Sequence, residues 1–167
     1  MAERFSGPSE AQRGQRRWRR DWFPYQEYLN VHYSHMDELY RRGYVLRDSL
    51  EFIEQYDQSG ELRFVVLRGR LACRNDAAVR VDKVLAVQKG RANRDEVLGV
   101  RYSYHAWVRS RPRRDLFRFD NAHGDVSTLH CHVFDAGVEA RVVPLTHDDL
   151  PRLDLIIESA VEMAQDS

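Results

Sequence analysis

The sequence predicts an α+β fold, in which an antiparallel meander sheet is flanked by an N-terminal and a C-terminal helix. Residues 25–42 and 151–165 carry apolar side chains at the i, i+3 and i+4 spacing of amphipathic helices. Much of the chain between them alternates apolar and polar side chains with a period of two, as half-buried strands do. Short turn sequences interrupt this alternation, so we expect consecutive strands to pair as neighbours.

The first 22 residues differ in kind from the rest of the chain. Residues 1–20 hold six arginines and two glutamates, a local charge of +4, although the whole chain balances 26 basic against 26 acidic residues. Glycine, proline and the lack of apolar periodicity predict a flexible arginine-rich arm at 1–22. In this arm Arg17 stands beside Trp18, a guanidinium and an indole that could hold single-stranded nucleic acid by stacking. A solubilising tail is the alternative.

A helical extension is expected at 23–43, where the helix follows Pro24 and ends at Gly43. The rest of the chain, residues 44–167, is expected to form the α+β domain. Its last helix carries apolar residues at helical spacing and should lie on the sheet.

The strands follow from alternation and turns. Residues 50–56 and 62–74 flank a turn at 57–60 and predict a hairpin, and a second turn at 75–76 leads to a strand that ends at 89–90. Residues 97–108 form the most strand-like run, with Tyr102 and Tyr104 on one side and His105 and Trp107 on the other. A turn at 111–115 leads into the strand around Phe117, which extends the meander.

Composition narrows the function classes. The balanced charge gives no overall field toward nucleic acid or an anionic membrane, so any nucleic-acid contact must be local. No apolar run reaches the roughly 18 residues of a membrane helix, and the first residues lack the apolar stretch of a signal peptide, so we expect no membrane partner. Cys73 and Cys131 lack the spacing of a zinc site and are too few for a disulfide framework. We therefore expect reduced thiols in a cytoplasmic protein.

Histidines are concentrated in one short segment. Three of the seven, His123, His130 and His132, fall within ten residues and have Asp120 and Asp135 beside them. If residues 129–135 form a strand, His130 and His132 share one face while the residues between them face the core. One side of this strand is then free for chemistry.

RNA cleavage without a metal is one chemistry that these residues could perform. It needs a base for the 2′-hydroxyl, an acid for the leaving oxygen and a cation near the phosphate, and histidine serves as base and acid near neutral pH. His130 and His132 would place their side chains roughly 6 to 7 Å apart. Asp120 would orient one imidazole, and Arg118 or Arg109 would face the phosphate.

Two other interpretations of the segment stay open. The two imidazoles, joined by His123, Asp120 or Asp135, would also suit zinc or another transition metal, although the third ligand and hence the metal and any cofactor are unknown. Alternatively, Asp120 and His123 lie in a hydrogen-bonded turn between strands, and His130 and His132 lie on a polar sheet face without chemistry.

A non-catalytic binding module is a further alternative. In it, an exposed aromatic face around Tyr102, Tyr104 and Trp107, together with the arm, would hold RNA, DNA or a protein. His105 in the same strand is typical of a packed, hydrogen-bonded histidine. Pairing of the Phe117 strand on both sides could still bring it toward the histidine segment, in a register that the sequence does not fix.

The order of these motifs resembles the TumE-like toxins of bacterial and archaeal toxin–antitoxin loci and their uncharacterised relatives. Those relatives carry a similar Tyr/Phe-Asp-Asn-x-His-Gly sequence followed by His-x-His and a closing helix. The likeness covers about residues 44–164 and is specific between 104 and 135. In this chain the motifs stand as Tyr104-His105, Phe119-Asp120-Asn121-Ala122-His123-Gly124 and His130-Cys131-His132-Val133.

The resemblance implies a compact α+β toxin that acts on RNA and has a cognate antitoxin as partner. Residues 1–43 lie outside the likeness. The positions that match the motifs of the family are Asp120, Asn121, His123, His130 and His132.

Overall fold

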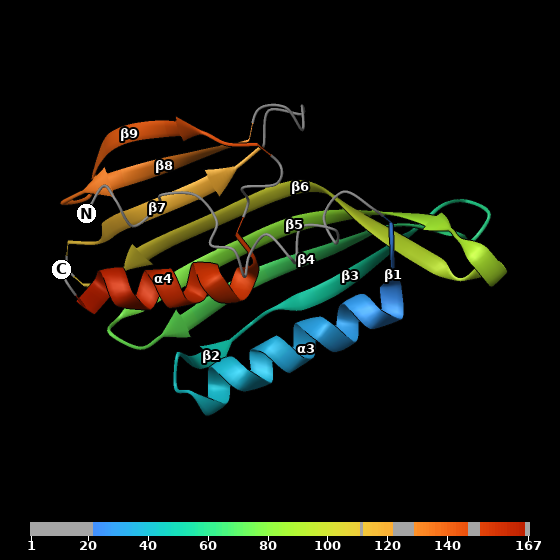
Figure 1. Cartoon of the computed structure of the whole chain (residues 1–167), viewed down its shortest axis with the longest axis horizontal. Helices are drawn as coiled ribbons and strands as arrows, with labels where there is room; N and C mark the ends of the chain where they lie inside the picture. The colour runs from blue at the N-terminus through green and yellow to red at the C-terminus, as the bar shows by residue number, and fades with distance from the viewer. Residues whose placement is uncertain (1–21, 111, 122–128, 147–150, 166–167) are drawn as a thin grey trace.

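The computed structural model describes residues 22–110, 112–121, 129–146 and 151–165. These residues form one antiparallel sheet and two α-helices, as the sequence predicts (Figure 1). The elements in chain order are β1 (Phe23–Pro24), α3 (Tyr25–Arg41), β2 (Val45–Asp48), β3 (Glu51–Tyr56), β4 (Leu62–Cys73), β5 (Ala77–Lys89), the short 3₁₀ helix η1 (Arg91–Asn93), β6 (Asp95–Val108), β7 (Arg114–Asp120), β8 (His130–Asp135), β9 (Val138–Pro144) and α4 (Leu153–Gln165).

The sheet is a meander along most of its width. From β4 to β9 each strand pairs antiparallel with the next in sequence. On the other side of β4, both β2 and β3 pair with it, and β1 pairs with the first residues of β6. The predicted meander is confirmed, but the sequence pattern does not predict the short strands β1 and β2 or the last strand, β9.

Left-handed backbone conformations occur where the chain reverses. Gly43 has φ of 68° just after α3, and a glycine adopts this conformation without a steric cost. Asn75 and Asp76 have φ of 58° and 56° between β4 and β5. Asn and Asp tolerate the left-handed region better than other side chains, which explains their use in this tight turn.

Both helices cover the same face of the sheet (Figure 1). Met36 and Leu39 from α3 and Ile157 and Val161 from α4 belong to one apolar core with the strand side chains beneath them. Each of these four is less than a tenth exposed, and truncating a buried Ile or Leu to Ala typically costs about 2–5 kcal/mol. None of the described helices is long and apolar enough to cross a membrane.

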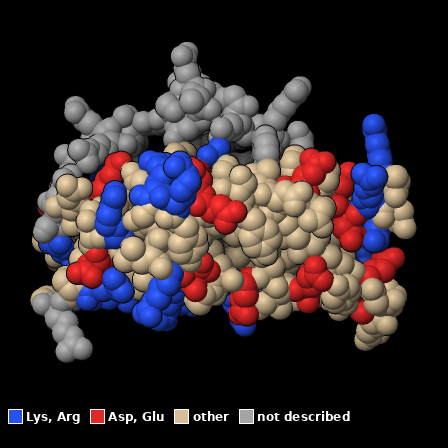
Figure 2. All heavy atoms as spheres, turned by 90° about the horizontal axis from the view of Figure 1, so that it is seen from below, with Lys and Arg blue, Asp and Glu red and all other residues tan. Residues whose placement is uncertain are grey.

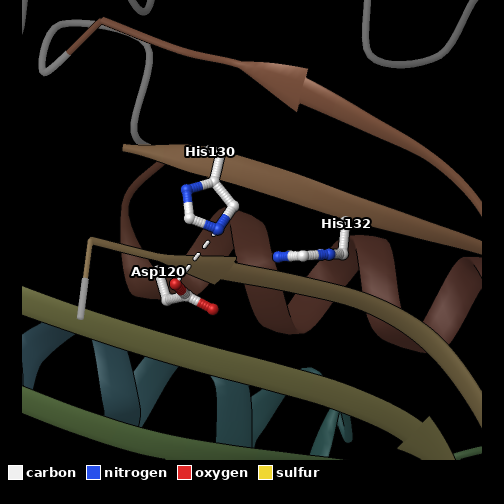
Figure 3. A group of neighbouring side chains, drawn as sticks. All are labelled: Asp120, His130 and His132. Carbon is white, nitrogen blue, oxygen red and sulfur yellow. Dashed lines mark ion pairs between the residues drawn. The ribbon is translucent and has the colours of Figure 1, made fainter. Parts of the chain in front are cut away.

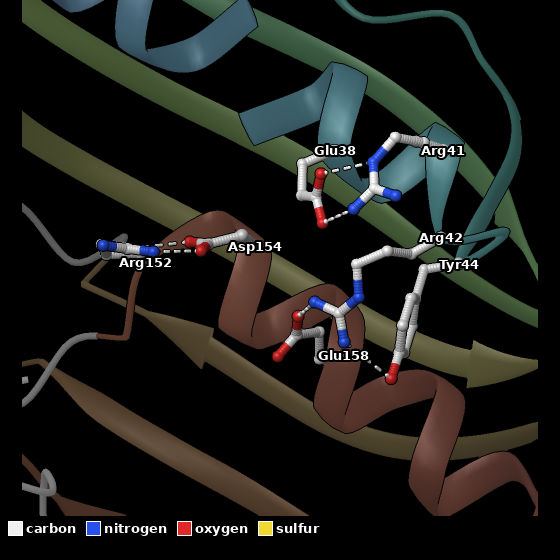
Figure 4. A network of polar contacts seen from close by, with 7 residues as sticks. All are labelled: Glu38, Arg41, Arg42, Tyr44, Arg152, Asp154 and Glu158. Atoms are coloured by element: carbon white, nitrogen blue, oxygen red, sulfur yellow. Dashed lines mark hydrogen bonds and ion pairs between the residues drawn. The ribbon is translucent and has the colours of Figure 1, made fainter. Parts of the chain in front are cut away.

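Polar contacts link the end of α3 to α4 (Figure 4). Arg42 places Nη1 2.5 Å from the Oε1 atom of Glu158, and its Nη2 donates to the hydroxyl of Tyr44 at 3.2 Å. The guanidinium also lies over the ring of Tyr44, 4.5 Å from the centroid. The pair of Glu38 and Arg41 lies at the surface and contributes little, since exposed ion pairs are worth about 0–1 kcal/mol.

The sheet therefore has two chemically different sides, which we call the helix face and the polar face. The polar face, turned away from the helices, has a row of directly paired residues that crosses five strands from β4 to β8. The row consists of Arg70, Arg80, His105, Arg118 and His132.

The predicted exposed aromatic face is wrong. Tyr102 and Tyr104 are each 3% exposed and belong to the core under the helices. Trp107 lies on the opposite face because side chains alternate along β6. These aromatic side chains therefore do not form one exposed surface.

On the side seen from below Figure 1, the charged side chains are mixed rather than gathered by sign. Lys and Arg lie there among Asp, Glu and uncharged residues (Figure 2). This distribution fits the balanced composition of 26 basic and 26 acidic residues. A site for an anionic polymer would therefore depend on particular side chains rather than on a general field.

Candidate functional site

A buried carboxylate lies at the end of β7. The side chain of Asp120 is 7% exposed, and its backbone pairs with His130 on β8. Its Oδ1 lies 3.2 Å from Nε2 of His130 (Figure 3). A buried carboxylate requires such partners, since burying an unpaired charge is costly.

Two histidines share the polar face of β8, as the sequence predicts. Leu129 and Cys131 are buried beneath the sheet, so His130 and His132 lie together on the other side. Their ring centroids are 4.7 Å apart, at an angle of 68° between the rings (Figure 3). This is closer than the 6 to 7 Å expected from strand geometry, because the rings approach one another edge to face.

Arg118 joins the carboxylate to the second histidine. Its Nε lies 2.7 Å from Oδ2 of Asp120, and its Nη2 lies 2.9 Å from Nε2 of His132. The Arg118 side chain is 40% exposed, so the guanidinium is also accessible from solvent. We call Arg118, Asp120, His130 and His132 the β7–β8 cluster.

These contacts determine where His132 carries its proton. A guanidinium only donates hydrogen bonds, so Nε2 of His132 accepts from Arg118 and the proton is on Nδ1. Nδ1 in turn lies 2.5 Å from Oε2 of Glu139, which accepts this proton's hydrogen bond. The ring is therefore held in one orientation from both sides.

Sequence reasoning missed Glu139, because it did not predict β9. Gly137 in the turn between β8 and β9 has φ of 82°, typical of a tight hairpin. The short sequence from Asp135 to Val138 was the signal that could have revealed this hairpin. A register shift between Val133 and Phe134 then brings Glu139 to the histidine side of the sheet.

Asn121 fixes the end of β7. It is 3% exposed, its Oδ1 accepts from the backbone N–H of Tyr102 at 2.7 Å, and its Nδ2 donates to the carbonyl of Val100 at 3.2 Å. Its own backbone N–H donates to the carbonyl of Tyr102 at 3.1 Å. Asp120 is thereby held against β6 from the next residue, which gives Asn121 a positioning role.

A comparison with protein-family models matches residues 37–160 to Toxin TumE. The match spans 124 of the 167 residues and includes the whole β7–β8 cluster. The chain belongs to the TumE toxin family. It is therefore a toxin of a toxin–antitoxin system, with a cognate antitoxin as its partner. Searches of curated proteins and of solved structures gave no match.

The β7–β8 cluster of this TumE-family toxin has the donor set of a transition-metal site. One ligand atom each from Asp120, His130 and His132 lies within 4.8 Å of the others. Two imidazoles and a carboxylate suit zinc or iron. The guanidinium of Arg118 occupies part of this space, however, because it contacts both the carboxylate and Nε2 of His132. A metal would have to displace this cation.

A second histidine group lies beside the cluster on the polar face of the toxin. Nε2 of His105 is 3.0 Å from Oδ1 of Asp115, which also pairs with Arg113 at 3.0 Å. The Arg113 guanidinium stacks over Trp107, 4.4 Å from the ring centroid. Burial lowers the pKa of His105, although the charge of Asp115 opposes this.

His105 therefore does not reach Asp120. In the register of β6 and β7, His105 pairs with Arg118, while Asp120 pairs with Ser103. The two histidine groups of the toxin are neighbours with Arg118 between them.

Other predicted site residues of the toxin do not meet in the cluster or cannot be placed. Arg109 follows β6 and pairs with Asp76 at 3.2 Å. It lies six residues beyond the Ser103 that faces Asp120, about 20 Å along the sheet. His123, Arg17 and Trp18 lie outside the described residues.

Proposed function

We propose that this toxin cleaves RNA at the β7–β8 cluster by acid–base catalysis. The proposal rests on the position of the Arg118 guanidinium, which lies 2.7 Å from Asp120 and 2.9 Å from His132. Beside it are two imidazoles whose ring centroids are 4.7 Å apart. Cleavage through the 2′-hydroxyl needs a base, an acid and a cation for the phosphate, and these residues supply all three.

The roles follow from the hydrogen bonds. His130, oriented by Asp120, takes the proton of the 2′-hydroxyl, whose oxygen attacks the phosphorus. When Arg118 leaves Nε2 of His132, this nitrogen takes up a proton from solvent while Glu139 holds the proton on Nδ1. His132 then gives the Nε2 proton to the 5′ oxygen as the bond from phosphorus to that oxygen breaks. Arg118 turns from its protein partners to the phosphate and neutralises the charge that develops there. The products are a 2′,3′-cyclic phosphate and a free 5′-hydroxyl.

A path for the RNA backbone leads away from the cluster along the polar face. Arg70 and Arg80 stand in the same cross-strand row as Arg118, both are exposed, and neither has an acidic partner within the described part of the chain. Unpaired guanidinium groups on one face suit successive phosphates. The arginine-rich arm with Arg17 and Trp18 adds a further basic segment for the same partner.

The test is an RNA cleavage assay in the presence of a chelator, with total RNA and a defined oligonucleotide. A His130→Ala, His132→Ala double variant should lose at least about 1,000-fold in rate, since each acid or base typically contributes 10²–10⁴-fold. His105→Ala is the matched control and should stay within about threefold, because His105 contacts Asp115 instead of the cluster. Cleavage that persists in a folded double variant would refute the proposal.

A metal-dependent reaction at the same residues is the second candidate. It is favoured by the 4.8 Å spacing of the ligand atoms of Asp120, His130 and His132. Under this alternative the purified toxin holds a stoichiometric metal that the double variant lacks, and the chelator stops cleavage. Elemental analysis of both proteins separates the two chemistries, because the acid–base mechanism predicts full activity with a chelator present.

A further inference from the structure

A cavity lies on the helix face of the sheet, opposite the β7–β8 cluster. It has a volume of about 500 Å³ and lies between α3, the beginning of α4 and strands β5 and β6. Such volumes are typical of small-molecule sites, which range over about 300–1,000 Å³. Its lining includes Tyr28, His32, Lys83, Leu85, Val97 and Tyr102.

One wall of the cavity is formed by residues that precede the region matched to the family. Phe23, Tyr28 and His32 line it, and they precede residue 37, where the match to the family begins. The opposite wall, from β5 and β6, lies within the match. The cavity thus depends on the first part of α3, which this chain has in addition to the matched region.

Lys83 brings an uncompensated positive charge to this aromatic cavity. Its Nζ donates to the hydroxyl of Tyr28 at 2.9 Å and lies 4.9 Å and 5.3 Å from the ring centroids of Tyr28 and Tyr102. No carboxylate pairs with Lys83 among the residues that the structure describes. Arg152 also lines the cavity, but it pairs with Asp154 (Figure 4). Lys83 is therefore the cation of this lining that remains for an anion.

The neighbouring histidine adds no second charge at neutral pH. Burial, followed by the charge of Lys83, lowers the pKa of His32 to about 4. Its ring packs edge to face on Phe52, with centroids 4.9 Å apart. The lining also includes His35 and the Arg152–Asp154 pair, whose two charges compensate each other. The single ammonium of Lys83 therefore matches an anion with one negative charge, because a doubly charged phosphate would remain half compensated.

We propose that this cavity binds a small organic monoanion with an aromatic body, whose acidic group pairs with Lys83 and whose ring packs between Tyr28 and Tyr102. Removing the ammonium from water costs free energy, which cation–π contacts offset in part and a bound anion would offset further. This inference goes beyond the proposed ribonuclease activity and shares no residue with it.

Two matched fluorescent probes test the proposal on the full chain. 8-Anilinonaphthalene-1-sulfonate carries the aromatic body and one negative charge, and N-phenyl-1-naphthylamine is the same body without the sulfonate. The chain has two lysines, so Lys83→Met and Lys89→Met make the same change of charge inside and outside the cavity. We expect one saturable site for the sulfonate. Its affinity should fall about tenfold or more in Lys83→Met, as for a lost charge-assisted contact, and stay unchanged in Lys89→Met.

The neutral probe should bind all three proteins within about twofold, which separates loss of the charge from collapse of the cavity. Equal affinity of the two methionine variants for the sulfonate, or no saturable binding to the native chain, would overturn the proposal.

A second measurement serves if Lys83→Met does not fold. ¹³C-dimethylation of the native chain labels Lys83, Lys89 and any free α-amine, and the NMR spectrum of Lys89→Met assigns the two lysine signals. The sulfonate should shift the Lys83 signal and leave that of Lys89 in place, and any other pattern contradicts the assignment of the site.

Discussion

Histidines lie on both faces of the sheet in opposite chemical settings. On the helix face, His32 packs among aromatic rings, and burial lowers its pKa to about 4. On the polar face, His130, His132 and His105 each lie within 3.2 Å of a carboxylate. Burial makes the first ring a neutral packing group, whereas the carboxylates hold the other rings in fixed orientations on the polar face. The face on which a histidine lies decides its chemistry more than its position in the sequence.

The largest expected effect tests whether the two histidine groups of the polar face act as separate sites. Arg118→Met removes the cation of the β7–β8 cluster, and we expect kcat/KM for RNA cleavage to fall about 100-fold, as for other groups that stabilise a developing charge. Arg113→Met is the matched control, because Arg113 contacts Asp115 and Trp107 instead. Single-turnover rates on one oligonucleotide give the comparison. Similar losses in both variants would mean that the two groups form one site.

The second prediction concerns the helix face and acid. The folded protein favours neutral His32, since its pKa is lowered from 6.5 to about 4. The resulting stability is complete above about pH 6.5 and is lost as the pH falls from 6.5 toward 4. Between pH 7.5 and pH 5, the free energy of unfolding of the native chain should therefore fall by about 2 kcal/mol more than that of His32→Gln.

Urea denaturation at pH 7.5 and pH 5 measures this change. The reference variant is His105→Gln on the polar face: burial also lowers the pKa of His105, but less than that of His32, so this variant should remove a smaller part of the same pH dependence. A pH dependence of His32→Gln that parallels the native chain would show that His32 is charged in the folded state.

The smallest expected effect concerns the row of arginines. Arg70→Gln with Arg80→Gln should weaken RNA binding about tenfold near 100 mM salt, and lower the slope of log affinity against log salt by about 1.4, the value for two phosphates of a single strand. Arg91 and Arg94, exposed near the turn between β5 and β6, provide the control pair. An unchanged slope in the first pair would place the RNA elsewhere.

Local sequence patterns predicted the α+β class, both helices and the strands from β3 to β8, because period, turn residues and caps are local properties. They also predicted that His130 and His132 share a face, which follows from alternation alone. The contact of Asp120 with His130 and the position of Arg118 depend on the register between strands, which single segments do not encode.

Local sequence patterns also could not predict which face of the sheet the helices cover. Tyr102 and Tyr104 alternate as an exposed or a buried face would, and only the packing of α3 and α4 on that side decides that they are buried. The cavity beside Lys83 has the same origin, since it forms where a helix that is distant in sequence crosses β5 and β6. These features are tertiary, so the sequence pattern gave no sign of them.

Asn121 links β6 to features on both faces of the sheet. Its hydrogen bonds hold the backbone of Tyr102, whose side chain lines the cavity, while the preceding residue is the carboxylate of the cluster. One amide side chain thus ties the backbone beside the cavity to the end of β7. A change at Asn121 would therefore disturb the backbone of Tyr102 and the position of the Asp120 carboxylate together.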